Sequence, residues 1–232
     1  THILEHLDRL IEIFNVCWPM YAAMPAVLKE AVEKSYEDCG WNLTESTNKY
    51  GNNLYPTFAD VMRNIRTVID SSDYDKDNKG AYKGSLETRL RSLTNGINGQ
   101  IFTTDELSNE ELFDRNVIVD LSRVGSNETK SLIMGLLVLK LQEYRMNQGS
   151  SKLKHVTVLE EAHNLLKRTS TEQSSESANL IGKSVEMLTN SIAEMRSFGE
   201  GFIIADQAPG LLDMAVIRNT NTKIILRLPE QS

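Results

Sequence analysis

Two adjacent acids, Glu160 and Glu161, follow a short apolar and β-branched run at residues 156–159. Such a run is typical of a buried parallel strand, and ligands of α/β sheets bind at the carboxyl ends of such strands. One carboxylate there can hold a Mg²⁺-bound water, and the other can polarise the water that attacks a phosphate. The pair therefore indicates a nucleotide hydrolase, although a solvated acidic strand end is a common alternative.

A glutamine at the end of another apolar run could complete such a site. Residues 205–209 read Ala-Asp-Gln-Ala-Pro, and the amide of Gln207 can hydrogen-bond a γ-phosphate or orient a water. Pro209 and Gly210 predict a turn at the same place. For this segment taken alone, the turn is the better interpretation.

Three arginines could meet a transferring phosphoryl group, from the same subunit or from a neighbouring one. Arg196 closes the helix expected before Gln207, and Arg227 lies in an otherwise apolar run, where a charge without a partner is costly. Arg218 lies between them. Arg196 is equally explained as a cation placed favourably at a helix C-terminus.

Gly182, Lys183 and Ser184 resemble the end of a phosphate-binding P-loop. The full pattern needs a glycine five residues before Gly182, where Ser177 stands. The segment also has helical periodicity and no strand before it, so we expect a helix there and no phosphate loop.

The composition narrows the class of protein. A chain of 232 residues suffices for one large α/β domain, or for a core with a helical subdomain. No apolar run approaches the roughly 20 residues of a membrane span, and no secretory signal is present, so we expect a cytoplasmic protein. The two cysteines have no CxxC spacing, and His2 and His6 lack a third ligand, so no zinc site is expected. The net charge of −7 gives nucleic-acid binding no bulk support, but a ring around DNA needs only a few basic groups at its pore.

The first part of the chain, residues 1–98, is expected to form a helical subdomain. Thr57 and Asp60 are spaced like a capping box, and Pro25 suits the first turn of a helix. We expect loops at residues 42–56 and 70–80. The apolar spacing predicts helices over residues 4–14, 25–35, 58–68 and 85–93.

The second part, residues 99–232, alternates between apolar strands and helices, which predicts a parallel sheet with crossover helices. The Ser/Thr/Glu-rich stretch 169–177 should be a mobile loop. Strands are expected at residues 117–121, 156–159, 202–205 and 223–228, and helices at 129–146, 178–198 and 213–218.

The order of these pieces resembles the HerA-type branch of the HerA–FtsK superfamily, hexameric P-loop ATPases that move or unwind DNA. The resemblance covers most of the chain. It is carried by VIVDLS at 117–122, VLEEAH at 158–163, EMRSFG at 194–199, IIADQAP at 203–209 and NTNTKIILR at 219–227. It implies a RecA-like P-loop NTPase core with a parallel sheet, incomplete in this chain, plus the helical subdomain. Related conjugation ATPases share a similar arrangement.

The resemblance also implies roles for single residues. Residues 156–161 resemble a Walker B strand, in which Glu160 would be the Mg²⁺-associated acid and Glu161 the catalytic glutamate. The first acid is usually Asp, so Glu160 departs from the broad pattern. Gln207 resembles the strand-end sensor glutamine, and Arg196 and Arg227 resemble phosphate or inter-subunit sensors. The implied cofactors are ATP and Mg²⁺.

The implied partners are double-stranded DNA and further copies of the same protein in a hexamer. The resemblance leaves a nuclease or effector partner open and implies no membrane insertion. Phosphate contacts to DNA are expected from the basic residues nearest the candidate pore loops, although each is equally explained as a solvated surface residue. These residues are Lys152, Lys154, Lys167, Arg168 and Lys183.

Two parts of the family pattern are absent from the chain, the Walker A loop and the small N-terminal β-barrel. We therefore expect a fragment of a longer ATPase, with the Walker A loop upstream of Thr1 and residues 1–98 as the insertion between Walker A and Walker B. The isolated fragment should then have little ATPase activity. A conjugation or secretion ATPase, or a non-enzymatic assembly module, remains an alternative function.

Overall fold

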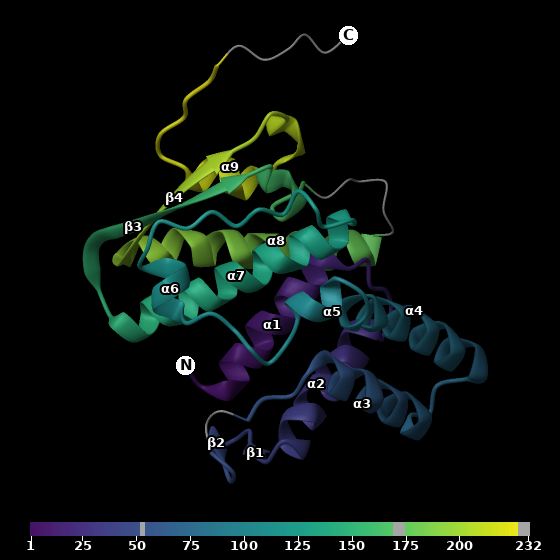
Figure 1. Ribbon diagram of the computed structural model, residues 1–232. Coiled ribbons are helices and arrows are strands. Elements are labelled where there is room, and N and C mark those ends of the chain that lie inside the picture. Colours follow the sequence, from purple (N-terminus) through teal and green to yellow (C-terminus); the bar gives the residue numbers. More distant parts are fainter. Residues whose placement is uncertain (52–53, 169–174, 227–232) are drawn as a thin grey trace. The chain divides into compact units, whose positions relative to one another are not determined.

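The computed structural model describes residues 1–51, 54–168 and 175–226 (Figure 1). The chain divides into two compact units. The first consists of Thr1–Ile11 and Met20–Ser108, and the second of Glu12–Pro19 and Asn109–Ser232. Helix α1 (Ile3–Cys17) therefore contributes residues to both units. Within the described ranges, no helix combines the length and the apolar character that crossing a bilayer requires.

The first unit is mainly helical, as its apolar spacing predicts. Its helices are α2 (Met24–Asp38), α3 (Phe58–Ser71), α4 (Lys76–Thr94) and the short α5 (Asn98–Ile101). A small hairpin of β1 (Trp41–Asn42) and β2 (Thr47–Asn48) lies between α2 and α3. The apolar faces of α2, α3 and α4 pack together, and Leu28, Ile65 and Leu86 are fully buried.

The start of α3 confirms the predicted capping box. The Thr57 hydroxyl accepts a hydrogen bond from the Asp60 backbone N–H, and the Asp60 carboxylate accepts one from the Thr57 backbone N–H. The expected loop at residues 70–80 is wrong in its second half, because α4 already begins at Lys76. The Asp75 side chain caps this start by accepting hydrogen bonds from the backbone N–H groups of Asp77 and Asn78.

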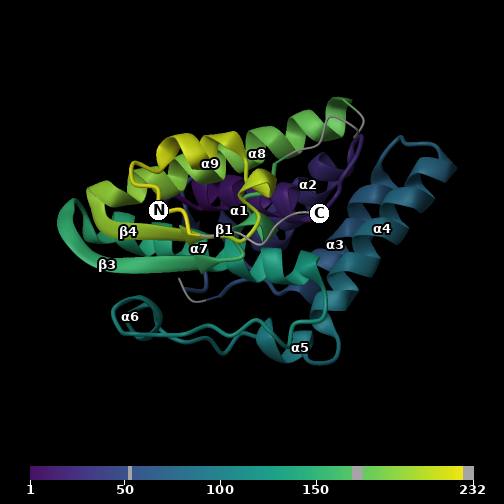
Figure 2. The ribbon, with the colours of Figure 1, turned by 90° about the horizontal axis from the view of Figure 1, so that it is seen from above.

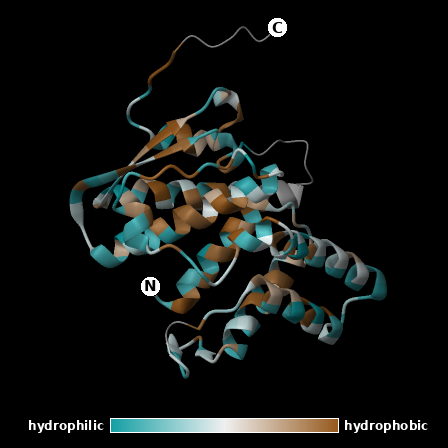
Figure 3. Ribbon diagram, in the orientation of Figure 1, coloured by the Kyte–Doolittle hydropathy of each residue, from teal (hydrophilic) through white to brown (hydrophobic). Residues whose placement is uncertain are grey.

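The second unit is a mixed α/β assembly. It contains α6 (Asn109–Phe113), α7 (Asn127–Gln148), α8 (Ser175–Glu194) and α9 (Met214–Asn219), with strands β3 (Ser151–Glu160) and β4 (Phe198–Ala205). The two strands are parallel, and the register places Val158 opposite Ile203 and Glu160 opposite Ala205. Helices α7 and α8 run beside the sheet (Figure 2), and apolar residues gather on the strands and these helices (Figure 3).

A glycine lets the two strands approach closely where they begin. Gly199 has a φ of +87°, and a Cβ on it would lie 2.6 Å from the Lys152 carbonyl oxygen. Any other residue at position 199 would be both strained and in collision with the backbone. The register shift between Ser151 and His155 lies beside this contact.

Two predicted strands are not formed in the part of the chain that the structure describes. Residues 117–121 have no regular secondary structure, and Ile118 is 94% exposed. Residues 223–226 likewise form no strand, and Ile224 and Ile225 are 84% and 85% exposed. A strand needs the backbone hydrogen bonds of a neighbour, and among the described residues only β3 and β4 pair with each other in parallel. Residues 227 and 228 lie outside the described residues.

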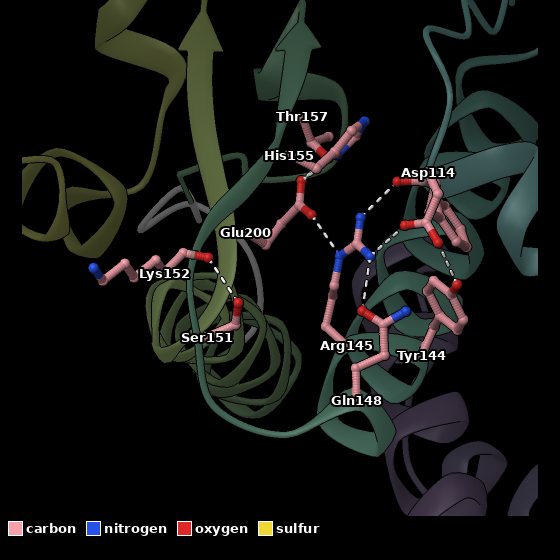
Figure 4. A network of polar contacts seen from close by, with 10 residues as sticks. Asp114, Tyr144, Arg145, Gln148, Ser151, Lys152, His155, Thr157 and Glu200 are labelled. Carbon is pink, nitrogen blue, oxygen red and sulfur yellow. Dashed lines mark hydrogen bonds and ion pairs between the residues drawn. The ribbon is translucent and has the colours of Figure 1, made fainter.

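A buried ion pair fixes the first half of the sheet (Figure 4). The Arg145 side chain on α7 is 1% exposed, and its Nε donates to Glu200 Oε2 of β4 at 2.8 Å. The Glu200 side chain is fully buried. Its Oε1 accepts a hydrogen bond from Thr157 Oγ1 at 2.7 Å and lies 2.7 Å from His155 Nδ1. One carboxylate thus links helix α7 to both strands.

The same guanidinium reaches the end of α6, the residue that follows it and the last residue of α7. Arg145 Nη1 donates to Asp114 Oδ1 at 2.7 Å and to Gln148 Oε1 at 3.1 Å, and Nη2 donates to the Phe113 carbonyl oxygen at 2.5 Å. The Tyr144 hydroxyl donates to Asp114 Oδ2 at 2.5 Å. Hydrogen bonds from Tyr144 and Arg145 hold the pKa of Asp114 below its ordinary value. The network therefore has a carboxylate on each side of Arg145.

Candidate functional site

The two adjacent acids lie at the carboxyl end of β3 but differ in backbone conformation. Glu160 is the last strand residue and pairs with Ala205 of β4. Glu161 has φ 50° and ψ 44°, the left-handed conformation that residues other than glycine rarely adopt. The 3₁₀ turn η1 (Ala162–Asn164) follows at once. Both acidic residues are exposed, so their carboxylates can meet a ligand at this edge of the sheet.

Contacts on the following turn hold Glu161 in this conformation. The Glu161 carbonyl oxygen accepts hydrogen bonds from the Asn164 backbone N–H at 2.9 Å and from Asn164 Nδ2 at 3.0 Å. Ala162, Leu165 and Leu166 are fully buried and anchor the turn. A left-handed residue persists only where its surroundings fix it, and such positions cluster at functional sites.

A buried aspartate ties this turn to the end of β4. Asp206 Oδ2 accepts hydrogen bonds from the His163 backbone N–H at 2.8 Å and from the ring Nδ1 at 2.9 Å. Its Oδ1 accepts one from the Ala208 backbone N–H at 2.7 Å. Burial alone would raise the pKa of Asp206, but the hydrogen bonds from Ala208 and His163 outweigh it and keep the pKa below its ordinary value. Asp206 is therefore ionised at neutral pH.

The predicted sensor glutamine lies at the same edge of the sheet as the two acids. Because β3 and β4 are parallel and Glu160 pairs with Ala205, Gln207 follows its strand at nearly the same level as Glu161 follows β3. Gln207 is exposed. The turn that Pro209 predicts is also present, as the 3₁₀ turn η3 (Pro209–Leu211). A turn and a sensor glutamine are thus compatible at this position.

One of the predicted arginines, Arg196, does not join Glu161 within one chain. Arg196 lies in the 3₁₀ turn η2 (Met195–Ser197) before β4, whereas Gln207 follows that strand. Eight strand residues span about 25 Å, so Arg196 is at the opposite end of the sheet. Arg218 is exposed on α9. Arg227 lies outside the described residues.

The donors at this edge suit magnesium bound together with a nucleotide. Among the described residues, no group of three or more His, Cys, Asp or Glu side chains could enclose a metal ion. Mg²⁺ usually takes one or two carboxylates and completes its shell with waters and substrate phosphates. The exposed carboxylates of Glu160 and Glu161 fit such a partial set of oxygen ligands. These donors are compatible with Mg²⁺ that is bound together with a nucleotide.

The GKS sequence at residues 182–184 is helical, as predicted. It lies inside α8, where Lys183 is exposed and Ser184 is fully buried. The Ser184 hydroxyl donates to a carboxylate oxygen of Glu12. These residues form no phosphate-binding loop.

The basic residues predicted to contact DNA are all exposed, but they do not lie together. Lys152 and Lys154 lie near the start of β3, and Lys167 and Arg168 follow its carboxyl end beyond η1. Lys183 is on α8. Contact with DNA phosphates stays a prediction for each of them.

The sequence patterns gave no role to Asp206, His163, Arg145 or Glu200. A signal for the first two was available: Asp206 directly precedes Gln207, and His163 follows the acidic pair by two positions. Parallel strands place such flanking residues side by side. Arg145 and Glu200 gave no comparable signal, because a charge in a helix or a strand is read by default as exposed.

No family model matches this chain. The DNA double-strand break repair helicase HerA of Sulfurisphaera tokodaii is 23% identical to it over 210 residues, which are 89% of this chain and 40% of that protein. Among solved structures, VirB4 of Thermoanaerobacter pseudethanolicus is similar with a TM-score of 0.57 at 14% identity, over 94% of this chain and 53% of that one. This likeness confirms the expected fold class, a P-loop ATPase-like α/β fragment with a small parallel sheet and many helices. The chain spans about half the length of these proteins or less.

Proposed function

Because this chain is a relative of the HerA–FtsK-type ATPases, we propose that it supplies the acidic half of an ATP-hydrolysing site. The observation that carries the proposal is the left-handed turn that places Glu161 at the carboxyl edge of β3, beside the Asp206-Gln207 end of β4. An exposed carboxylate next to an exposed amide is the pair that orients and deprotonates an attacking water in nucleotide hydrolases.

Each residue at this edge then has a distinct task. Glu161 accepts the proton of the water that attacks the terminal phosphorus, and Gln207 holds that water or a γ-phosphate oxygen through its amide. Glu160 would hold Mg²⁺ through a bound water. When bound, ATP would supply the phosphoryl group, and Mg²⁺ would neutralise the charge that develops on it.

The proposal needs a phosphate-binding loop that residues 1–232 do not contain. No segment of the chain has the full GxxxxGK[ST] pattern. We place that loop in a longer protein, so the whole motor, rather than these residues alone, would hydrolyse ATP. Isothermal titration of residues 1–232 with Mg²⁺-ATP should therefore detect no micromolar binding. A micromolar dissociation constant would contradict this division of the site.

We further propose that ATP hydrolysis drives movement along double-stranded DNA, in a hexamer and together with a nuclease or effector partner. The relative from Sulfurisphaera tokodaii, named as a DNA repair helicase, supports this choice. A conjugation or secretion ATPase is the alternative among motors. Hydrolysis that double-stranded DNA accelerates, and that falls steeply with added salt, would favour the DNA motor.

The central test is Glu161→Gln in the protein made from the complete reading frame. The change removes the proton acceptor but keeps the size and shape of the side chain, so ATP hydrolysis should fall by about 10²-fold or more. Binding of ATP, measured by fluorescence anisotropy, should stay within about threefold, because the phosphates are held elsewhere.

The matched control is Glu186→Gln, which changes an exposed glutamate on α8 away from the strand ends. It should leave hydrolysis unchanged. Full turnover by the Glu161→Gln protein would remove Glu161 from the catalytic role. Absence of ATP binding by the complete protein would instead favour a non-enzymatic assembly module.

A further inference from the structure

The turn that carries Glu161 is held by a side chain from the neighbouring strand end. Asp206 Oδ2 accepts hydrogen bonds from both the backbone N–H and the ring Nδ1 of His163. A carboxylate only accepts, so the ring nitrogen that faces it carries the proton. This bond fixes which tautomer a neutral His163 adopts and how its ring is oriented.

The same ring nitrogen faces Glu161. His163 Nδ1 lies 3.7 Å from Glu161 Oε2 and 2.9 Å from Asp206 Oδ2. The N–H group therefore lies between two carboxylates, one with a side chain 2% exposed and one with a side chain 50% exposed. The buried carboxylate holds the ring, and the positive end of the ring N–H attracts the exposed one.

The two carboxylate oxygens of Asp206 accept hydrogen bonds from different turns, one after β3 and one after β4. Oδ2 binds the turn after β3 through His163, and Oδ1 binds the Ala208 N–H in the turn that carries Gln207. Further along, the Arg168 N–H donates to the Leu211 carbonyl oxygen at 2.7 Å, and the Asp213 N–H donates to the Leu166 carbonyl oxygen at 2.9 Å. The two turns are therefore joined by side-chain and backbone bonds, and a shift of one is passed to the other.

We propose that Asp206 and His163 are positioning residues that aim the Glu161 carboxylate and couple it to the turn that carries Gln207. Neither residue needs to touch the nucleotide. Asp206 orients His163, and His163 restrains Glu161 in its left-handed turn with the carboxylate directed at the place of the attacking water. The inference rests on the proposed function of Glu161.

The first test replaces His163 by Ala in the protein made from the complete reading frame. Loss of the ring leaves Glu161 without its restraint, so we expect kcat to fall about 10- to 100-fold, while KM for ATP stays within about twofold. His163→Asn keeps an N–H donor at the position of Nδ1 and should recover most of the lost kcat. His2→Ala, which removes an imidazole from the other unit, should change nothing.

A combined variant separates positioning from a merely structural role. In a Glu161→Gln background, His163→Ala should cause no further loss of hydrolysis, because His163 acts through Glu161. A further tenfold loss in that background would overturn the proposal, and so would an unchanged kcat in the single His163→Ala variant. A fall in kcat that His163→Asn does not reverse would also overturn it.

The outcomes also distinguish this inference from the proposed function. If Glu161→Gln hydrolyses ATP at the wild-type rate, the proposed function fails, and the positioning role falls with it. If Glu161→Gln is inactive and His163→Ala is fully active, the positioning role alone fails. Melting temperatures of all variants, measured alongside, identify any loss that comes from unfolding rather than from misplacement of Glu161.

Discussion

At the scale of single residues, Glu160 and Glu161 have chemically identical side chains but different backbone conformations. Glu160 is still a strand residue, so its direction is set by the pleat of β3 and by its pairing with Ala205. Glu161 has left the strand in a left-handed turn, in which Asn164 binds its carbonyl oxygen and His163 Nδ1 lies 3.7 Å from its carboxylate. Adjacent carboxylates can therefore point at different parts of one substrate, which a regular strand would prevent.

The left-handed conformation of Glu161 predicts an unusual response to glycine. Glycine adopts this conformation without a steric penalty, whereas other residues lose about 1–2 kcal/mol there. The greater freedom of unfolded glycine costs about 0.5–1 kcal/mol. Glu161→Gly should thus be as stable as the unchanged chain, or up to about 1.5 kcal/mol more stable. Urea unfolding of residues 1–232 measures the difference.

Glu160→Gly is the matched control for this prediction. Residue 160 is in an ordinary strand, so glycine there brings only the entropic cost and should destabilise the chain by about 0.5–1 kcal/mol. If the two glycine variants lose the same stability, residue 161 does not adopt the left-handed turn in solution. In the complete protein, Glu161→Gly should lose hydrolysis in either case, because the carboxylate is gone.

At the scale of helices and strands, the sequence predicted features that depend on residues close together in the chain. It did not predict features that depend on contacts with distant segments. Thr57 and Asp60 lie three residues apart and cap each other, so the start of α3 could be predicted. The earlier start of α4 was missed because Gly80 and Gly84 weaken the helical pattern after Asp75. The strand predicted at residues 117–121 is wrong, because an apolar pattern alone does not supply the neighbour that a strand must pair with.

That Glu160, Glu161 and Gln207 lie at one edge of the sheet could be predicted for a similar reason. They come just after apolar runs, and parallel strands bring their carboxyl ends to one edge. The Asp206–His163 contact depends on the register between strands, which the sequence leaves open. Register also decides that Glu200 faces His155 and Thr157, so the buried network of Arg145 could not be foreseen.

The Arg145–Glu200 pair predicts a large loss of stability when one partner is removed. Arg145→Met leaves the fully buried Glu200 carboxylate without its cation, which should destabilise the chain by about 3–5 kcal/mol in denaturant unfolding. The exposed control Arg123→Met should change stability by less than about 0.5 kcal/mol. Replacing both partners, with Glu200→Leu added, should recover much of the loss. A single Arg145→Met variant as stable as the control would show that this network contributes nothing.

At the scale of the whole molecule, the second unit exposes apolar residues of the kind that parallel sheets bury. Val158 and Ile203, which pair across β3 and β4, are each 54% exposed, and Ile118 and Ile224 are exposed almost fully. Buried parallel sheets are covered on both faces. This exposed apolar surface agrees with the comparisons, in which the chain matches only 40% and 53% of the lengths of the two proteins that it resembles.

Because Arg196 and Glu161 are far apart in one chain, we predict that they meet only between two subunits. Arg196 lies at the opposite end of β4 from Gln207, so within one chain it cannot reach a phosphate bound at the proposed site of Glu161. If the complete protein forms a ring through heterologous contacts, Arg196 of one subunit can enter the site of the next. Arg196→Ala and Glu161→Gln should each abolish hydrolysis by the complete protein, while mixing the two should restore part of it.

The extent of recovery follows from how the subunits combine. In a random equal mixture, about a quarter of the sites join an intact Glu161 to an intact Arg196 from the neighbouring subunit, so about a quarter of the wild-type rate should return. Arg218→Ala, which removes an exposed arginine of α9, serves as the control and should retain activity unmixed. If the mixture stays inactive although native mass spectrometry shows mixed rings, Arg196 does not act across a subunit interface. Recovery would instead mean that each ATP site is completed by two copies of this chain.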